Sequence, residues 1–280
     1  MLDIIGNIYH NESRQFLERP MMHITGKTRI FPIIGSPVST VFSPPAFNIA
    51  FQERGLDIVM VPMEISAEQV HGFWELLRDS ANMIGCSVTY PHKQAAFAAM
   101  DACTPRAARL GAVNTVRCED GQLIGDATDG LAMCAAIDLT GTPVKHGVAH
   151  VLGAGGGAGI AIVDALCERG ISELVLGETD EFRAQSVRDL LAQFWPDVTV
   201  STSAKPSAIL INATTLGKSS GDAMPFGAEM IRTAALVCDA VTRDTPTALC
   251  ATATANNKPT VSGDQMGQCQ IDVQLEFVTG

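Results

Sequence analysis

The sequence lacks the features that mark membrane-spanning, exported or nucleic-acid-binding proteins. It contains no apolar run of the roughly eighteen residues that a transmembrane helix needs. Its first residues lack the basic, apolar and small segments of a signal peptide. Basic side chains are scarce, because 19 lysines and arginines against 30 aspartates and glutamates leave a net charge of −11, which disfavours nucleic acid or an anionic membrane as a partner. We therefore expect a soluble cytoplasmic protein.

Patterns that hold metals are also missing. The eight cysteines include no C-x-x-C pair, and the six histidines show no H-E-x-x-H or other paired spacing. Zinc sites commonly use such spacings, so we expect no metal. Most of the cysteines stand among apolar neighbours, which predicts small buried side chains in a reducing compartment.

A length of 280 residues exceeds the usual size of one compact core, so two domains are expected. In the first part, short apolar runs alternate with amphipathic stretches, which favours an α/β layer with parallel strands. Ser43, followed by Pro44, is predicted to cap one helix, and Ser66 to begin another. Strands are predicted at 30–34, 58–63 and 83–88.

A hairpin is predicted to end this first alternation. Residues 112–116, 118–122 and 123–130 surround the dipeptide Asp120-Gly121, which favours a two-residue turn. An antiparallel hairpin beside parallel strands would make the first sheet mixed.

A second alternation begins near residue 148 and predicts a doubly wound, Rossmann-type sheet. Its order is strand, glycine loop, helix, strand, helix and then further strands. Apolar residues at roughly helical spacing predict a helix in the C-terminal tail. The predicted strands are 148–152, 173–177, 198–201, 208–213 and 235–241, and the helices are 157–169 and 180–194.

The glycine loop, residues 151–159 with the sequence VLGAGGGAG, follows a predicted strand and opens a predicted helix. Gly153 permits a tight turn, while Gly155 and Gly156 let backbone N–H groups approach a pyrophosphate at the helix N-terminus. Glycine-rich turns also occur in sheets that bind nothing, but here an acidic residue, Glu178, ends the next strand. The loop therefore predicts a dinucleotide site.

Glu178 also selects between the two dinucleotides. A carboxylate there can accept hydrogen bonds from the ribose hydroxyls of NAD, whereas it repels the 2′-phosphate of NADP. NAD is therefore the expected cofactor. Arg183, a little further along the chain, could reach that phosphate, so NADP stays open as the less favoured cofactor.

Seven segments together resemble the shikimate dehydrogenase family. They stand in the family's order and cover the chain from about residue 33 to the end. PHK, AVNT and TDG in combination are specific, whereas the glycine loop alone is not. The segments are SPPAFN (43–48), SVTYPHK (87–93), GAVNTV (111–116), GDATDG (125–130), GAGGGAG (153–159), INATTLG (211–217) and SGDQMGQCQ (262–270).

The resemblance implies reversible, NAD(P)-dependent interconversion of a ring alcohol and a ketone. The best-known members act on 3-dehydroshikimate and shikimate, and others act on quinate. It also implies two α/β domains with a cleft where they meet. We expect an N-terminal extension without assigned chemistry at 1–28, a substrate-binding domain with a mixed sheet at 29–131, an NAD-binding Rossmann domain at 132–262, and a closing helix at 263–280 that returns to the substrate domain.

By motif position, Lys93 matches the family's catalytic lysine and Asp129 its partner aspartate. Oxidising a carbinol releases a hydroxyl proton to a positioned base, and the reverse reaction needs an acid; Lys93 can be either. The expected substrate-binding residues are Ser43, Ser87, Thr89, Asn114 and Gln270. The expected cofactor-binding residues are Gly153, Ala154, Gly155, Gly156, Gly157, Ala158, Glu178, Thr179, Arg183, Asn212, Ala213, Thr214, Val241, Gly263 and Met266.

Each polar residue of this set also has an ordinary structural explanation. Lys93 could be a solvated charge, although the first turn of a helix disfavours cations. Asp129 could cap the helix that follows it. Gln270 could face solvent, while Asn114 and Thr89 could satisfy backbone groups at strand ends.

Some substrate-contacting positions depart from the family pattern. Val41 stands in place of a serine and Thr242 in place of a frequent tyrosine, while Ser87 and Ala127 each replace an asparagine. Losing two hydrogen bonds to a charged group, at about 1.5–3 kcal/mol each, weakens transition-state binding by about 3–6 kcal/mol. Unless neighbouring hydroxyls such as that of Ser39 compensate, we expect a substrate related to shikimate, such as quinate, an amino-shikimate or another cyclic polyol acid.

The leading prediction is an NAD-dependent dehydrogenase that oxidises a ring hydroxyl of shikimate or a related cyclic polyol acid. Hydride would pass to nicotinamide and the proton to Lys93, with Asp129 as its partner. The alternative is a protein of the same fold that binds the dinucleotide or a cyclic acid with little or no catalysis. The sequence does not decide between a monomer and a homodimer.

Overall fold

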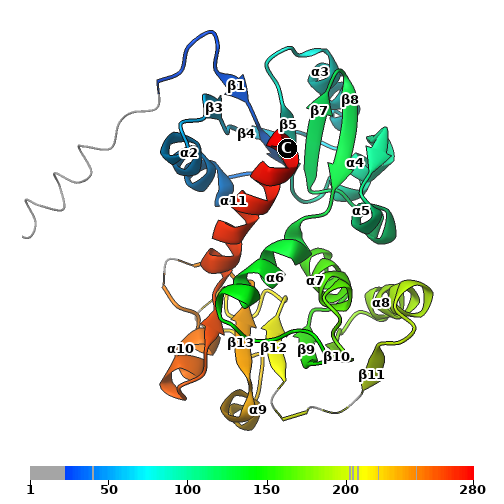
Figure 1. Cartoon of the computed structure of the whole chain (residues 1–280), viewed down its shortest axis with the longest axis vertical. Coiled ribbons are helices and arrows are strands. Elements are labelled where there is room, and N and C mark those ends of the chain that lie inside the picture. The colour runs from blue at the N-terminus through cyan, green and yellow to red at the C-terminus, as the bar shows by residue number, and fades with distance from the viewer. Residues whose placement is uncertain are drawn as a thin grey trace, which may run out of the picture.

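A computed structural model describes residues 23–280, apart from the single positions 40, 202, 204, 207, 220 and 244. Most of the predicted N-terminal extension therefore lies outside the described residues. The described part forms two α/β units, one above the other along the long axis of the molecule (Figure 1). Each unit contains a six-stranded sheet, and the upper unit also contains a two-stranded one. No helix in this part of the chain combines the length and apolar character needed to cross a membrane.

The first large sheet is mixed, as the sequence predicts. Its order is β4, β2, β5, β7, β8, β6, and both the β5–β7 and β7–β8 pairs are antiparallel while the others are parallel. Asp120 and Gly121 form the hairpin turn at φ values of 51° and 76°. The strands are β2 (Ile33–Gly35), β4 (Pro62–Glu64), β5 (Gly85–Val88), β6 (Ala102–Cys103), β7 (Thr115–Glu119) and β8 (Gln122–Asp126).

Two predicted strands are each divided in the structure. The run 30–34 supplies the end of β1 (Arg29–Ile30) and the beginning of β2, and Pro32 lies between them. The run 58–63 supplies β3 (Ile58–Val59) and the beginning of β4. A proline has no N–H to donate to a ladder. Accordingly, β1 and β3 pair with each other, and β2 and β4 pair in the larger sheet.

Two helix starts predicted in this region are wrong, the first by one residue and the second by about four. Helix α2 has Phe42 at its N-cap, so Ser43 is the first helical residue and no side chain caps the helix. Helix α3 begins at Val70 rather than near Ser66, because residues 67–69 form a turn first. The helices around this sheet are α2 (Ser43–Glu53), α3 (Val70–Asp79), α4 (Lys93–Ala99) and α5 (Pro105–Leu110).

The second large sheet is entirely parallel and doubly wound, which confirms the predicted Rossmann-type fold. Numbered within the sheet, its strands lie in the order 3-2-1-4-5-6, the arrangement that binds dinucleotides at the switch point between strands 1 and 4. The sequence does not predict the short elements β14 (Thr260–Val261), α9 (Ala228–Thr233) and α10 (Ala248–Ala255). Its strands are β9 (Val148–Leu152), β10 (Glu173–Gly177), β11 (Thr199–Ser201), β12 (Ile209–Asn212), β13 (Leu236–Asp239) and β14 (Thr260–Val261).

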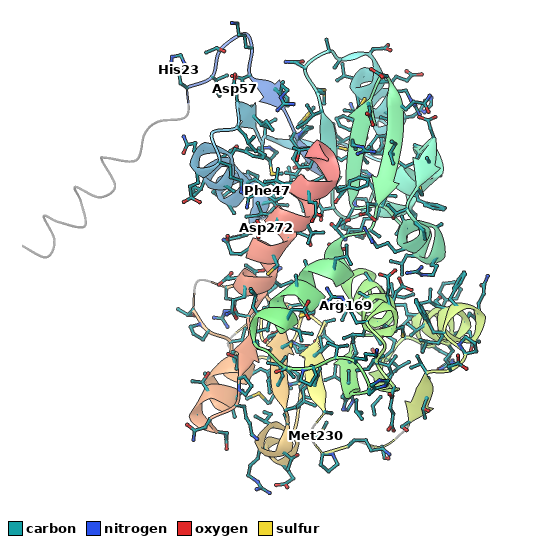
Figure 2. All side chains as sticks on the ribbon, viewed as in Figure 1. His23, Phe47, Asp57, Arg169, Met230 and Asp272 are labelled. Atoms are coloured by element: carbon teal, nitrogen blue, oxygen red, sulfur yellow. The ribbon has the colours of Figure 1, made fainter. Side chains whose placement is uncertain are left out.

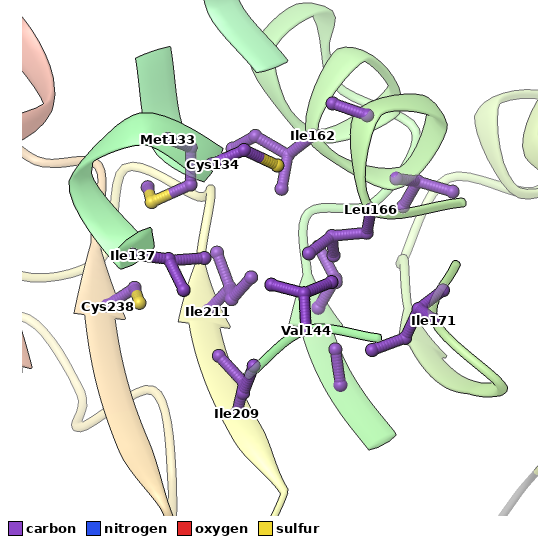
Figure 3. Packing of buried hydrophobic residues seen from close by; sticks show 14 of the residues in the cluster. Met133, Cys134, Ile137, Val144, Ile162, Leu166, Ile171, Ile209, Ile211 and Cys238 are labelled. Carbon is purple, nitrogen blue, oxygen red and sulfur yellow. The ribbon is translucent and has the colours of Figure 1, made fainter. Parts of the chain in front are cut away.

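Buried side chains from opposite layers form the core of the second unit (Figure 3). The helices of this unit are α6 (Asp129–Leu139), α7 (Gly157–Glu168), α8 (Glu181–Phe194), α9 (Ala228–Thr233) and α10 (Ala248–Ala255). Met133 and Ile137 of α6 and Ile162 of α7 meet the strand residue Ile211 there (Figure 3). Cys134 belongs to the same cluster, and burial raises the pKa of its thiol to about 12, so it stays protonated at neutral pH.

Helix α11 (Gly263–Thr279) joins the two units and carries functional side chains to their boundary (Figure 1). Ser262 caps it in a capping box with Gln265. Its second half packs against α2, where Ile271 shares an apolar cluster with Phe47. Phe47 and Asp272 are labelled at this contact in Figure 2.

Gly130 allows α6, which begins at Asp129, to lie directly against α7. A Cβ atom at Gly130 would lie 2.0 Å from the carbonyl oxygen of Ala161. We expect Gly130→Ala to destabilise the chain by about 1–3 kcal/mol and to lower Tm by several degrees, measured by thermal melting. Gly72→Ala is the matched control, since nothing lies within 4 Å of that Cβ position. Equal melting of the two variants would contradict the tight helix contact.

Candidate active site

A cavity of about 200 Å³ lies between the two sheets and α11. The polar side chains that reach it come from both units and from α11, although they are far apart in the sequence. All five predicted substrate-binding residues and both predicted catalytic residues line it. The lining consists of Ile33, Ser43, Ser87, Val88, Thr89, Lys93, Asn114, Asp129, Ala240, Thr242, Gly263, Met266, Gly267, Gln270 and Gln274.

Lys93 and Asp129 form an ion pair inside this cavity. Lys93 is the first residue of α4 and Asp129 the first residue of α6, so two helix starts meet here. The Lys93 Nζ donates to Asp129 Oδ2 at 2.6 Å, and the two side chains are 25% and 18% exposed. A partly desolvated lysine with a carboxylate partner is suited to exchange a proton with a ligand in the cavity.

Asp129 is held by three donors. Beyond Lys93, its Oδ1 accepts from Asn114 Nδ2 at 2.6 Å and from Gln270 Nε2 at 3.1 Å. The alternative that Asp129 caps its own helix is wrong, because Thr128 occupies the N-cap and no side-chain capping bond is formed. The alternative that Gln270 faces solvent is also wrong, since it reaches both Asp129 and Thr128.

Asn114 is fixed in orientation by its second partner. Its Oδ1 accepts from the backbone N–H of Thr128 at 2.7 Å, which leaves Nδ2 as the group that points to Asp129. Asn114 is only 4% exposed. Asn114 therefore satisfies the backbone N–H of Thr128 and also positions Asp129.

The positions that depart from the family pattern have different surroundings. Val41 packs against the apolar cluster beneath α2 and does not line the cavity, whereas Thr242 does. Ala127 is buried beside the site, and Ser39 is exposed and not among the lining residues. Ser39 therefore does not bring a hydroxyl into the cavity in place of the serine that the family has at position 41.

Gln274 is a lining residue that the sequence reasoning missed. It follows Gln270 by four positions, and both belong to the predicted C-terminal helix. Residues four apart share a helix face, so a Gln270 that faces the cavity places Gln274 beside it. That spacing was the available signal.

The glycine loop has the shape that a pyrophosphate requires. Gly153 turns the chain at φ 74°, and Gly156 is the N-cap of α7, which begins at Gly157. A Cβ at Gly159 would lie 1.9 Å from the Gly153 carbonyl oxygen, whereas one at Gly157 would meet nothing within 4 Å. The loop therefore packs tightly against the helix at Gly159, whereas the space beside Gly157 at the helix N-terminus is open. This arrangement fits an anionic group bound by backbone N–H donors. Ala158 follows in the first turn of α7.

Glu178 stands beside this loop at the end of β10. Its Oε2 accepts from the N–H of Gly155 at 3.1 Å, and its Oε1 accepts from the N–H of Thr179 at 2.8 Å. A recess of about 330 Å³ adjoins it, large enough for part of a nucleotide. The recess is lined by Ala154, Leu176, Glu178, Glu181, Ala184, Val187, Arg188, Val200 and Ser201.

The two arginines near the recess have different positions. Arg183 is exposed and does not line the recess, and its main chain packs against Gly155. Arg188 does line it, and its guanidinium donates to the Glu181 carboxylate at 2.5 Å. Glu181 and Glu178 thus place two carboxylates around this recess.

The remaining predicted cofactor residues lie around the switch point. Asn212 is fully buried, and its Nδ2 donates to Asp239 Oδ1 at 2.9 Å while its Oδ1 accepts from Thr214 Oγ1 at 2.6 Å. Its amide therefore shapes the loop. Ala213 and Thr214 pack against the turn at Gly153. Val241 packs against Gly263 at the start of α11. Gly263 and Met266 line the cavity.

Comparisons with known proteins agree with this geometry. A family model described as the shikimate dehydrogenase substrate binding domain matches residues 33–116. A Rubrobacter xylanophilus protein named "Shikimate dehydrogenase (NADP(+))" is 37% identical over 79% of this chain and 79% of its own. One of the same name from Rhodospirillum rubrum is 36% identical over 86% and 88%.

Solved structures give the same result. Shikimate 5-dehydrogenase from Listeria monocytogenes, in complex with shikimate and NAD, has a TM-score of 0.82 at 27% identity and covers 92% of this chain and 93% of its own. The Thermus thermophilus enzyme, in complex with NADP(H) and shikimate, has a TM-score of 0.78 at 27% identity, with coverages of 90% and 94%. This chain belongs to the shikimate dehydrogenase family.

Proposed function

We propose that the protein is a dehydrogenase that reversibly oxidises a ring hydroxyl of shikimate or a related cyclic polyol acid, with NAD as its preferred cofactor. The observation that carries the proposal is the Lys93–Asp129 pair inside a polar cavity at the boundary of the two units. Relatives named shikimate dehydrogenase and the two ligand-bound structures support the substrate class. We assign residues 29–131 and 263–280 to substrate binding and 132–262 to the dinucleotide.

The proton is the part of the reaction that the protein's own side chains handle. When bound, nicotinamide supplies the hydride chemistry. In oxidation, Lys93 Nζ takes the hydroxyl proton from the carbinol as the hydride leaves, and in reduction it returns that proton to the ketone oxygen. Asp129 orients Lys93 through their ion pair at 2.6 Å. Asn114 and Gln270 hold Asp129 in the required position.

The dinucleotide would lie along the glycine loop and the Glu178 carboxylate. Backbone N–H groups at the start of α7 would bind the pyrophosphate, and Glu178 would accept hydrogen bonds from the adenosine ribose. The curated relatives described above are named for NADP(+). Two observations favour NAD here: the carboxylates of Glu178 and Glu181 both line the recess, and the nearby Arg188 is already paired with Glu181.

A direct test is the oxidation of a panel of cyclic acids by the purified full chain with NAD⁺ or NADP⁺. Shikimate, quinate and amino or deoxy analogues form the panel, and NAD(P)H absorbance is the measurement. We expect turnover with at least one of them and a higher kcat/KM with NAD⁺. Calorimetric binding of NAD⁺ without turnover of any acid would favour the alternative of a binding protein with the same fold.

Glu178→Gln is expected to shift the cofactor preference. The exchange keeps the shape of the side chain but removes the charge that accepts from ribose and repels a 2′-phosphate. A charge-assisted hydrogen bond contributes about 1.5–3 kcal/mol, so the NAD⁺ to NADP⁺ ratio of kcat/KM should fall by about 10- to 100-fold. Glu229→Gln, at an exposed ion pair on α9, is the control. An unchanged ratio in the Glu178 variant would remove the basis for the NAD preference.

A further inference from the structure

Two buried threonines lie directly behind the Lys93–Asp129 pair. Thr115 is the first residue of β7 and Thr128 is the N-cap residue of α6, and both are fully buried. Neither is among the described residues that line the cavity, so any effect on a ligand must pass through other residues. They belong to the AVNT and TDG segments of the sequence, yet neither is among the predicted site residues.

The hydroxyl of Thr128 does not cap the helix that follows it, because no side-chain capping bond is formed. Its Oγ1 lies 3.1 Å from Asn114 Oδ1 and 3.1 Å from Gln270 Nε2. Thr115 Oγ1 lies 3.0 Å from Thr128 Oγ1 and 3.2 Å from Asn114 Oδ1. The Thr128 hydroxyl thus contacts both of the amides that hold Asp129.

Counting donors shows where the two hydroxyl protons go. A hydroxyl has one proton to donate, whereas an amide NH₂ group can only donate. Gln270 therefore donates to Thr128 Oγ1, which leaves the Thr128 proton for Asn114 Oδ1 or Thr115 Oγ1. The Thr115 proton can go to Asn114 Oδ1 or Thr128 Oγ1. Because the two threonines cannot donate to each other at once, Asn114 Oδ1 accepts at least one hydroxyl proton in every arrangement.

These donors fix the direction of the Asn114 amide. Its Oδ1 accepts from the backbone N–H of Thr128 as well as from the threonine hydroxyls, so Nδ2 is the group that faces Asp129. Turning the amide over would place its NH₂ group against these donors and its oxygen against the Asp129 carboxylate. Because the network is buried, such a mismatch is costly, and the satisfied arrangement is rigid.

We infer that Thr128 is a positioning residue for the Lys93–Asp129 pair. Its hydroxyl holds the amides of Asn114 and Gln270 in the orientation in which each donates to Asp129. Asp129, held in this way, keeps Lys93 Nζ in place through their ion pair. This inference rests on the proposed function and adds a buried residue, remote from any ligand, to the machinery that handles the proton.

The test compares Thr128→Val, which keeps the branched shape but removes the hydroxyl, with Thr128→Ser, which keeps the hydroxyl but removes the methyl group. The measurement is oxidation of the best cyclic acid with NAD⁺. We expect Thr128→Val to lower kcat about three- to tenfold, the effect of weakening one hydrogen bond, with KM for the acid within twofold. Thr128→Ser should keep at least half of the original kcat, although it melts at a lower temperature because a buried methyl group is lost.

Thr140→Val is the matched control, because Thr140 lies at the other end of α6 and its hydroxyl donates to the Ile137 carbonyl. A residue that only supports the fold would leave kcat unchanged. A kcat for Thr128→Val within twofold of this control, or an equal loss in Thr128→Ser, would overturn the inference.

Thr115→Val serves in place of Thr128→Val if that variant does not fold. It removes the hydroxyl behind Thr128, and we expect it to lower kcat about two- to threefold. A kcat equal to that of Thr140→Val would then overturn the inference.

The reaction of Lys93 with acetic anhydride gives a readout that needs no turnover. Mass spectrometry of the cofactor-free protein measures the rate of acetylation, with the exposed Lys27 as the reference in the same sample. We expect Lys93 to react at least twofold faster in Thr128→Val, because Asp129 is held less firmly beside it, and at the original rate in Thr128→Ser. This result would support the inference even if no acid were oxidised, which would contradict the proposed function alone. An unchanged rate in Thr128→Val would contradict the inference even in an active dehydrogenase.

Discussion

Lys93→Met is expected to lower kcat about 10²- to 10⁴-fold, the contribution of a positioned general acid or base. Methionine keeps the apolar stem but cannot carry the proton that leaves the carbinol. Because both partners of the pair are partly exposed, the melting temperature should change little. Steady-state oxidation of the best substrate with NAD⁺, together with thermal melting, measures both effects.

Lys27→Met provides the control, since Lys27 is exposed in a turn and does not line the cavity. Asp129→Asn should also reduce kcat, and the double variant should be little slower than Lys93→Met alone, because the two residues act as one unit. If Lys93→Met retained more than a tenth of the original turnover, the assignment of Lys93 as the proton carrier would be contradicted.

The residues around Lys93 could be predicted from the sequence because each lies at the start or end of a regular element. Lys93 and Asp129 begin helices, and Asn114 directly precedes the strand β7. In an α/β fold, such positions gather where the sheets end. The segment order then predicts Gln270 on a C-terminal helix, and in the structure Gln270 Nε2 donates to Asp129 Oδ1.

Contacts between side chains on different elements could not be predicted in this way. Gln274 carries no motif. Its spacing of four from Gln270 indicates the shared helix face, but its burial depends on how α11 packs against α2 and the first sheet. The run 30–34 is divided because β1 pairs with β3 whereas β2 pairs with β4, and these pairings link segments that are distant in the sequence. Helix α5 (Pro105–Leu110) is too short for a periodic pattern, and with it an ion pair between the units went unforeseen.

That ion pair joins Arg109 of α5 to Asp164 of α7. Arg109 donates through Nε and through a second nitrogen to the two carboxylate oxygens, each at 2.8 Å. Asp164 also accepts from Trp195 Nε1 at 2.8 Å, and the Arg109 guanidinium lies 5.0 Å from the centre of that ring system. Asp164 is 1% exposed, so its charge is compensated by these two partners rather than by water.

Arg109→Leu is therefore expected to destabilise the protein by about 3–5 kcal/mol, because it leaves a buried carboxylate with only the indole N–H. For a chain of this size the loss corresponds to a fall in Tm on the order of 10 °C, measured by thermal melting. Arg232→Leu removes the same side chain from the exposed pair with Glu229 and should cost at most about 1 kcal/mol. Replacing both Arg109 and Asp164 with leucine should recover part of the loss, because no uncompensated charge remains buried. If Arg109→Leu and Arg232→Leu melted together, the Arg109–Asp164 pair would not be what holds α5 against α7.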